Sequence, residues 1–161
     1  TPIKSSAASD VYKRQADGSR QLLYFGDNTF TDFTLEVDIA LAKSTGTSNA
    51  AGILLRGGNY AGTNDIGNYA IQGYYLAIYE GSIVLVRANY GETAEVASVP
   101  IDSAVNTYYN IRAVVRGNSI TIYRDDEVII NYTDAYAFVS GRIGLYTTGA
   151  ASYYKNLTVS A

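Results

Sequence analysis

Arginine and tyrosine gather at the ends of short apolar stretches between residues 52 and 90. Arg56 ends the stretch GILLR, Tyr75 and Tyr79 lie in GYYLAIYEG, and Arg87 closes SIVLVR. An arginine is rarely buried without a partner, and its rigid fork of donors suits paired polar groups on a ligand. A tyrosine ring adds a flat apolar face with a polar tip. We therefore expect this segment to bind a polar ligand. A sugar fits best, because aromatic faces pack on its C–H patches and planar polar groups bind its neighbouring hydroxyls.

The predicted ligand-binding residues are those that the expected strand order would bring to one rim. They are Arg56, Asn59, Tyr60, Tyr75, Tyr79, Arg87, Asn89 and Tyr90. Residues 57–68 form a Gly- and Asn-rich loop beside Arg56, and such loops on a rigid sheet often carry binding residues. Two alternatives stay open. The loop could be a plain surface connection, and Arg56 could be buried and paired with Glu36, Asp38 or Glu80.

Composition and charge remove several classes of function. The chain has 161 residues, which predicts one domain, and a net charge of −3 without a basic block, which argues against a nucleic-acid partner. No apolar run reaches the roughly 18 residues of a membrane-spanning helix, so we expect no membrane insertion. The chain has no Cys, His, Met or Trp, but 16 Tyr against 4 Phe.

Residues 33–41 alternate with a period of two, which is typical of a half-buried strand. Their odd positions are Phe, Leu, Val, Ile and Leu, and their even positions are Thr, Glu, Asp and Ala. We expect further strands at residues 51–56, 69–79, 82–89, 93–98, 107–116, 119–124, 127–132, 141–147 and 152–159. Turn signals at Glu80-Gly81, Tyr90-Gly91, Gly117-Asn118 and Asp125-Asp126 separate several of these strands. The pattern predicts an all-β, antiparallel sandwich or barrel without helices.

These elements, in this order, resemble the concanavalin A-like jelly roll. Within that class they resemble the laminin G-like group that includes levanase fructan-binding modules and 3-keto-disaccharide hydrolase domains. The resemblance rests on DFTLEVDI, AGILLR, GYYLAI, SIVLVR, YYNIRAVVRGNSITIYRDDEVI and SGRIGLYTTGAASYYKNLTV, and it covers residues 21–160. It implies an antiparallel β-sandwich in an extracellular protein that recognises carbohydrate. Lys155 and Asp126 stand where these relatives carry Asp and Gly, and Lys155 argues against carrying over a calcium ligand there.

Catalysis is not expected. Without His or Cys the chain cannot assemble a nucleophilic triad. Glycosidases with this jelly roll use Glu-x-Asp-x-(x)-Glu, because retaining hydrolysis needs two carboxyl groups about 5–5.5 Å apart. Glu36 and Asp38 match the first half, but Ala40 and Leu41 stand where the second Glu would fall. Glu36 and Asp38 would form a polar strand face or help hold a cation, which leaves a structural calcium ion open.

The N-terminal residues differ from the rest of the chain. Residues 1–20 are expected to form an arm or linker, and residues 21–161 the jelly-roll domain. The string SDVYKRQ at residues 9–15 resembles translated adaptor sequence of the kind found in metagenomic assemblies, so part of this arm would carry no evolved function.

The sequence thus predicts a non-catalytic carbohydrate-binding module of an extracellular polysaccharide-active protein, with an oligo- or polysaccharide as its partner. The alternative is a self-assembling extracellular subunit in which residues 1–24 insert as a strand into a neighbouring copy. Against this alternative, residues 1–15 lack the alternating apolar pattern that a donated strand needs.

Overall fold

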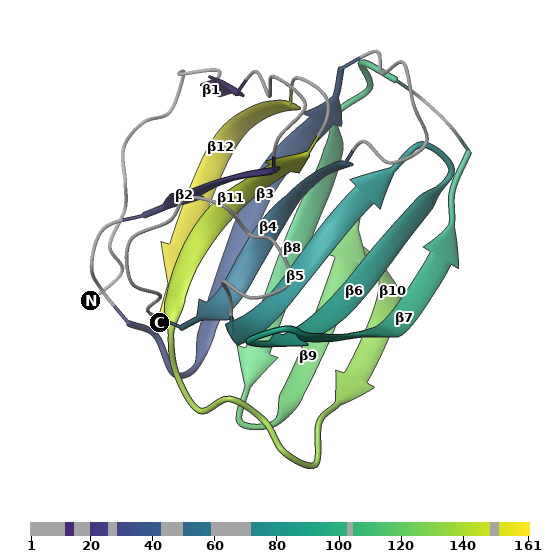
Figure 1. Cartoon of the computed structure of the whole chain (residues 1–161). Helices are drawn as coiled ribbons and strands as arrows, with labels where there is room; N and C mark the ends of the chain where they lie inside the picture. Colours follow the sequence, from purple (N-terminus) through teal and green to yellow (C-terminus); the bar gives the residue numbers. More distant parts are fainter. Residues whose placement is uncertain are drawn as a thin grey trace.

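The chain forms two antiparallel six-stranded sheets packed face to face (Figure 1). The computed structural model describes residues 12–14, 20–25, 29–42, 50–58, 72–102, 105–148 and 152–161. Sheet A has the order β1 (Tyr12–Arg14), β12 (Ser152–Ser160), β3 (Phe33–Leu41), β8 (Tyr109–Arg116), β9 (Ser119–Arg124) and β10 (Glu127–Thr133). Sheet B has the order β2 (Arg20–Tyr24), β11 (Arg142–Thr148), β4 (Ala50–Gly57), β5 (Gln72–Tyr79), β6 (Ser82–Asn89) and β7 (Glu92–Pro100).

This architecture confirms the predicted all-β jelly-roll sandwich. The strands over residues 33–41, 82–89 and 119–124 have the predicted bounds, and the others from β4 onward differ by a few residues at their ends. The strand β1 was not predicted, because its sequence YKR carries no apolar alternation. The part of the chain that the structure describes contains no helix long and apolar enough to cross a membrane.

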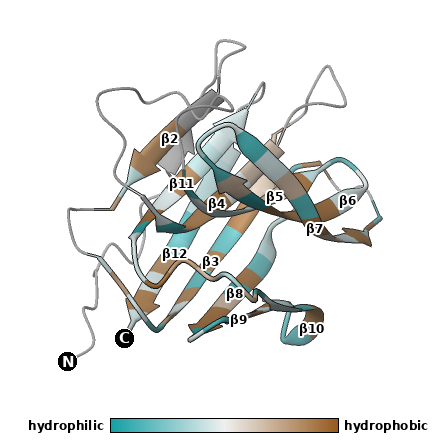
Figure 2. Cartoon of the chain, turned by 60° about the horizontal axis from the view of Figure 1, so that its bottom comes forward, coloured by the Kyte–Doolittle hydropathy of each residue, from teal (hydrophilic) through white to brown (hydrophobic). Residues whose placement is uncertain are grey.

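The core lies between the two sheets and is built by the period-two pattern. In β3 the side chains of Phe33, Leu35, Val37 and Ile39 are fully buried. The residues between them are half-buried, and the alternation stops at the end of the strand, where residues 39–41 are all buried. Figure 2 shows this alternation as successive brown and teal bands along the strands of sheet A. Burying one such side chain contributes about 1.5–3 kcal/mol, so the alternation itself holds the two sheets together.

Both described N-terminal strands pair within this chain. The strand β1 is hydrogen-bonded to β12 at the edge of sheet A, and β2 to β11 at the edge of sheet B. Residues 20–24 therefore form an edge strand of this chain's own sheet B. Residues 1–11 and 15–19 lie outside the described part of the chain, and self-association through the arm stays a prediction.

Candidate functional site

The connection between β10 and β11, residues 134–141, crosses one end of the sandwich and is called the strap here. It leaves the edge of sheet A and runs along the lower end of the molecule to sheet B (Figure 1). Side chains from the ends of three neighbouring strands of sheet B hold it, namely Arg87 of β6, Tyr74 of β5 and Arg56 of β4. A connection held at three successive strands presents its side chains on a fixed backbone.

Arg87 is held on one edge of its guanidinium and open on the other. Its Nε donates to Asp134 Oδ2 at 2.7 Å, and its Nη2 donates to the carbonyl of Tyr136 at 2.9 Å. The Phe138 ring lies against the guanidinium, with 4.3 Å between the guanidinium carbon and the ring centroid. Among the described residues, Nη1 has no acceptor, and the side chain is 24% exposed. The open edge can therefore donate to a ligand.

Asp134 holds the Arg87 side chain in place and is itself buried, with 7% of its side chain exposed. Its Oδ2 also accepts from the Tyr74 hydroxyl at 2.7 Å, and its Oδ1 accepts from the Tyr136 N–H at 2.8 Å. Burial alone would raise the pKa of Asp134, but the donors from Tyr74, Tyr136 and Arg87 outweigh it and lower the pKa below its ordinary value.

The charge state of the two partners follows from the same contacts. Burial lowers the pKa of Arg87, but the hydrogen bond to Asp134 and its charge more than compensate, so the pKa lies above its ordinary value. Burial, followed by the hydrogen bond to Asp134, raises the pKa of Tyr74 to about 12. At neutral pH the cluster therefore contains one guanidinium, one carboxylate and a neutral phenol, and its charges balance.

Aromatic side chains surround the Arg87–Asp134 pair. The Tyr74 ring lies 5.3 Å from that of Phe138 and 6.4 Å from that of Tyr132, between centroids. Tyr136 has its backbone held against Arg87 but its side chain 83% exposed. An exposed ring on a fixed backbone is a surface on which the apolar face of a sugar can stack. We call Tyr74, Arg87, Tyr132, Asp134, Tyr136 and Phe138 the Arg87 site.

Arg56 occupies a different position from Arg87, because it is buried with 2% exposure. Its Nε donates to the Thr31 carbonyl at 2.8 Å, and its Nη1 donates to the carbonyls of Gly117 at 2.6 Å and Phe138 at 2.7 Å. Its Nη2 donates to Thr31 and to Asp32 Oδ1. All five N–H groups are thus used within the protein. The alternative of a buried, paired Arg56 describes this geometry, with Asp32 as the partner in place of Glu36, Asp38 or Glu80.

The remaining predicted site residues do not converge on Arg87. Tyr75 and Tyr79 lie on the outward face of sheet B, with the Tyr75 ring 5.3 Å from that of Tyr146. This confirms that the two tyrosines share a face and that Tyr74 lies on the other. Asn89 accepts a hydrogen bond from the Gln72 amide at 3.0 Å, and Tyr90 lies in the β6–β7 turn with its ring 46% exposed. Asn59 and Tyr60 lie outside the described residues.

Of the six residues of the Arg87 site, the sequence predicted Arg87 alone and missed Tyr74, Tyr132, Asp134, Tyr136 and Phe138. A signal was present, since the segment YTDAYAF at the end of a strand sets one aspartate among three aromatic residues. An aspartate set among aromatic residues at a strand end differs from the solvated carboxylates of ordinary turns, and it marks a position where burial would require partners.

The carboxylates of β3 lie on the outward face of sheet A and are bonded to amides. Asn110 Nδ2 donates to Glu36 Oε1 at 3.1 Å and to Asp38 Oδ1 at 3.0 Å, and Asn156 Nδ2 donates to Asp38 Oδ2 at 2.7 Å. They form the polar face that the sequence suggested. No group of three or more metal-binding side chains occurs within the described ranges, and the calcium ion stays a prediction.

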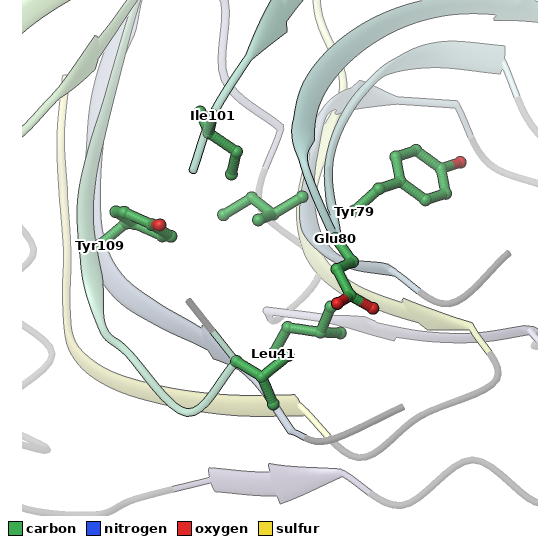
Figure 3. A pocket seen from close by; sticks show the side chains of 7 residues that line it. Leu41, Tyr79, Glu80, Ile101 and Tyr109 are labelled. Atoms are coloured by element: carbon green, nitrogen blue, oxygen red, sulfur yellow. The ribbon is translucent and has the colours of Figure 1, made fainter. Parts of the chain in front are cut away.

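A pocket opens at the opposite end of the sandwich and is apolar on most sides. Its empty volume of about 240 Å³ includes space that belongs to open solvent. Its lining residues are Leu41, Ile78, Tyr79, Glu80, Ile101, Val105 and Tyr109. Figure 3 shows the Tyr79 ring turned away from Tyr109 and Ile101 across the pocket. With one carboxylate at its mouth and no donor fork, this pocket offers a sugar less than the Arg87 site does.

The fold and the site together define an antiparallel jelly-roll module, and known proteins with this architecture are similar to the chain. A carbohydrate-binding module, CBM66 from Bacillus subtilis, has 21% sequence identity and a TM-score of 0.78, covering 92% of this chain and 86% of that one. A protein of unknown function with a galectin-like fold, from the same organism, has 13% identity and a TM-score of 0.70, covering 96% of this chain and 90% of that one. These likenesses show the shared fold.

Residues 5–160 match the 3-keto-alpha-glucoside-1,2-lyase-like domain family, and the chain belongs to this family. A levanase of Bacillus subtilis (strain 168) is 24% identical over 160 residues, which is 98% of this chain and 22% of the levanase. The chain thus spans about a fifth of that relative's length. The family and the levanase confirm the resemblance that the sequence indicated.

Proposed function

We propose that this chain binds carbohydrate at the Arg87 site and does not catalyse a reaction. The observation that carries the proposal is the open guanidinium edge of Arg87 beside the exposed ring of Tyr136. The names of the similar proteins support it, since one is a carbohydrate-binding module and another is a levanase. Because the chain spans about a fifth of the levanase, we propose that it acts within a longer, extracellular, polysaccharide-active protein.

The geometry of the Arg87 guanidinium favours a ligand with two neighbouring hydroxyl groups. Nε and Nη2 lie on one edge of the planar guanidinium, and this edge is taken by Asp134 and Tyr136. The edge formed by Nη1 and the second Nη2 hydrogen has no acceptor among the described residues, and it offers a parallel pair of donors. Two adjacent sugar hydroxyls can accept both, while the ring stacks on Tyr136.

The charge balance favours a neutral sugar over an acidic one. Asp134 already compensates the charge of Arg87 through a direct hydrogen bond at 2.7 Å. Because this charge is already compensated, a carboxylate on the ligand would gain less from Arg87 than from an unpaired arginine. We therefore propose neutral oligosaccharides as the ligand class, with levan as the first to test.

The same carboxylate is poorly suited to proton transfer. An effective general acid or base has a pKa near the working pH, whereas the pKa of Asp134 lies below its ordinary value and its oxygens already accept three donors. This supports binding without catalysis.

The decisive experiment is calorimetric titration with soluble levan, accompanied by an array of neutral and acidic glycans. Tyr136→Ala should weaken binding about fivefold, since stacking on one exposed ring is worth on the order of 1 kcal/mol. Its melting temperature should stay unchanged. Tyr153→Ala, a half-buried tyrosine on the outward face of sheet A, is the matched control and should bind normally.

Binding that is equal in the wild type and Tyr136→Ala would reject the site, and selective binding of acidic glycans would reject the ligand class. Release of a new product during prolonged incubation with the bound glycan would reject the non-catalytic role.

A further inference from the structure

We infer that Arg56 is a positioning residue: it fixes the strap, and through the strap it holds Arg87 in place and sets the ligand affinity of the Arg87 site. The effect on ligand affinity rests on the function proposed above. The effect on the position of Arg87 does not depend on that function. Arg56 contacts no ligand in this scheme, because its five N–H groups are all directed at protein oxygens.

The connection between the two arginines runs through Phe138. Arg56 Nη1 donates to the Phe138 carbonyl at 2.7 Å, and the Phe138 N–H donates to the Tyr74 hydroxyl at 3.2 Å. Both polar backbone groups of this residue are therefore held. Its ring then lies 4.3 Å from the Arg87 guanidinium and covers one face of it. A shift of the Phe138 backbone would move the surface on which Arg87 rests.

Arg56 also joins the strap to both sheets. It extends from β4 of sheet B, yet it donates to Thr31, just before β3, and to Gly117 in the β8–β9 turn of sheet A. The strap packs directly on its backbone, since a Cβ atom at Gly141 would lie 2.3 Å from the Arg56 carbonyl carbon. The guanidinium thus fixes the strap relative to the whole sandwich.

Lysine cannot replace these contacts. It has one ammonium group with three donors in place of a planar fork with five, and it cannot reach the carbonyls of Thr31, Gly117 and Phe138 together. Arg56→Lys therefore keeps the positive charge but loses most of the hydrogen bonds to these carbonyls. An effect of this variant on Arg87 would come from the lost hydrogen bonds and not from a lost charge.

The direct measurement is the nitrogen-15 NMR spectrum of the arginine side chains. The Nε–H of Arg87 is hydrogen-bonded to Asp134 and lies near the face of the Phe138 ring, so its resonance should be strongly displaced from that of exposed arginines. Phe138→Leu provides the reference for a lost ring. In Arg56→Lys the Arg87 resonance should move or broaden toward that reference, and the dissociation constant for soluble levan should rise about fivefold to tenfold.

A purely structural role would lower the melting temperature of Arg56→Lys and leave the Arg87 resonance where it is. If Arg56→Lys does not fold, Asp32→Asn removes the charged partner of Arg56 at the surface and should shift the resonance in the same direction by less. An unchanged Arg87 resonance in every folded variant would overturn the inference. A displaced resonance in a protein that binds no levan would overturn the proposed ligand and leave the positioning role intact.

Discussion

The hydroxyl of Tyr154, in sheet A, accepts a hydrogen bond from the backbone N–H of Gly52, in sheet B, at 3.0 Å. The same hydroxyl donates to the carbonyl of Tyr146, which lies opposite Gly52 in the register of β4 and β11. A side chain from one sheet is thus inserted into the backbone ladder of the other. Glycine is also required at position 52 by the neighbouring strand β5, because a Cβ atom there would lie 1.9 Å from the Leu76 carbonyl oxygen.

Tyr154→Phe should destabilise the fold by about 2 kcal/mol, because it leaves a buried N–H and a buried C=O without their shared partner. At this chain length the loss corresponds to roughly 4–8 °C in melting temperature. Thermal unfolding followed by circular dichroism measures it. Tyr153→Phe, one residue away on the outward face, is the control and should change little. Equal melting temperatures for the two variants would show that β4 and β11 close the gap by themselves.

Asp126→Gly should stabilise the protein by about 0.5 kcal/mol. Asp125 and Asp126 both have positive φ, at 48° and 68°, which the β9–β10 hairpin turn requires and which glycine adopts without a steric cost. The ion pair between Asp126 and Arg112 at 3.3 Å is lost, but it is exposed and contributes little. Urea unfolding measures the difference.

The matched variant Asp125→Gly relieves the same kind of strain but loses a useful contact. Asp125 Oδ1 accepts from the backbone N–H of Asn110 at 3.0 Å. We therefore expect Asp125→Gly to be no more stable than the wild type. A gain as large as that of Asp126→Gly would mean that this hydrogen bond contributes nothing.

Stability in acid should depend on Asp134. Its pKa is lowered in the folded protein, so its contribution is fully present above the unfolded value of about 3.9 and is lost as the pH falls through the lower folded pKa. Urea unfolding of the wild type and Asp134→Asn between pH 6 and pH 2.5 should give curves that converge as the pH falls. Parallel curves would show that the charge of Asp134 does not stabilise the fold.

Stability in alkali should depend on Tyr74. Its pKa is raised to about 12, so the folded state retains a proton that the unfolded chain releases near pH 10. The stabilisation is complete below pH 10 and is lost as the pH rises from about 10 to 12. Tyr74→Phe should flatten this part of the stability profile. An alkaline loss as steep as in the wild type would assign it to the other tyrosines.

The strands could be predicted because the information for them is local. In β3 every second residue is apolar, and the core of a two-sheet sandwich buries one face of each strand. The turns at Glu80-Gly81 and Gly117-Asn118 could be recognised for the same reason. Adjacent residues determine both features, whatever the rest of the chain does.

The site could not be predicted in the same way, because its contacts join distant residues. Arg56 is 25 residues from Thr31, 61 from Gly117 and 82 from Phe138 in the sequence. The sequence of β4 shows that a charged residue lies at the end of a strand. Whether its guanidinium binds a ligand or these three backbone carbonyls depends on three loops that are distant in the sequence. The burial of Asp134 likewise depends on where Arg87 and Tyr74 meet the strap.

The two arginines hold the strap by main-chain oxygens, those of Tyr136 and Phe138. Every residue type supplies the same carbonyl, so the anchors set no requirement on the side chains at positions 135, 136, 137 and 139. Relatives could exchange these residues and acquire new ligand preferences without rebuilding the scaffold. For protein engineering, the strap is the segment at which a randomised library would alter recognition while the sandwich is preserved.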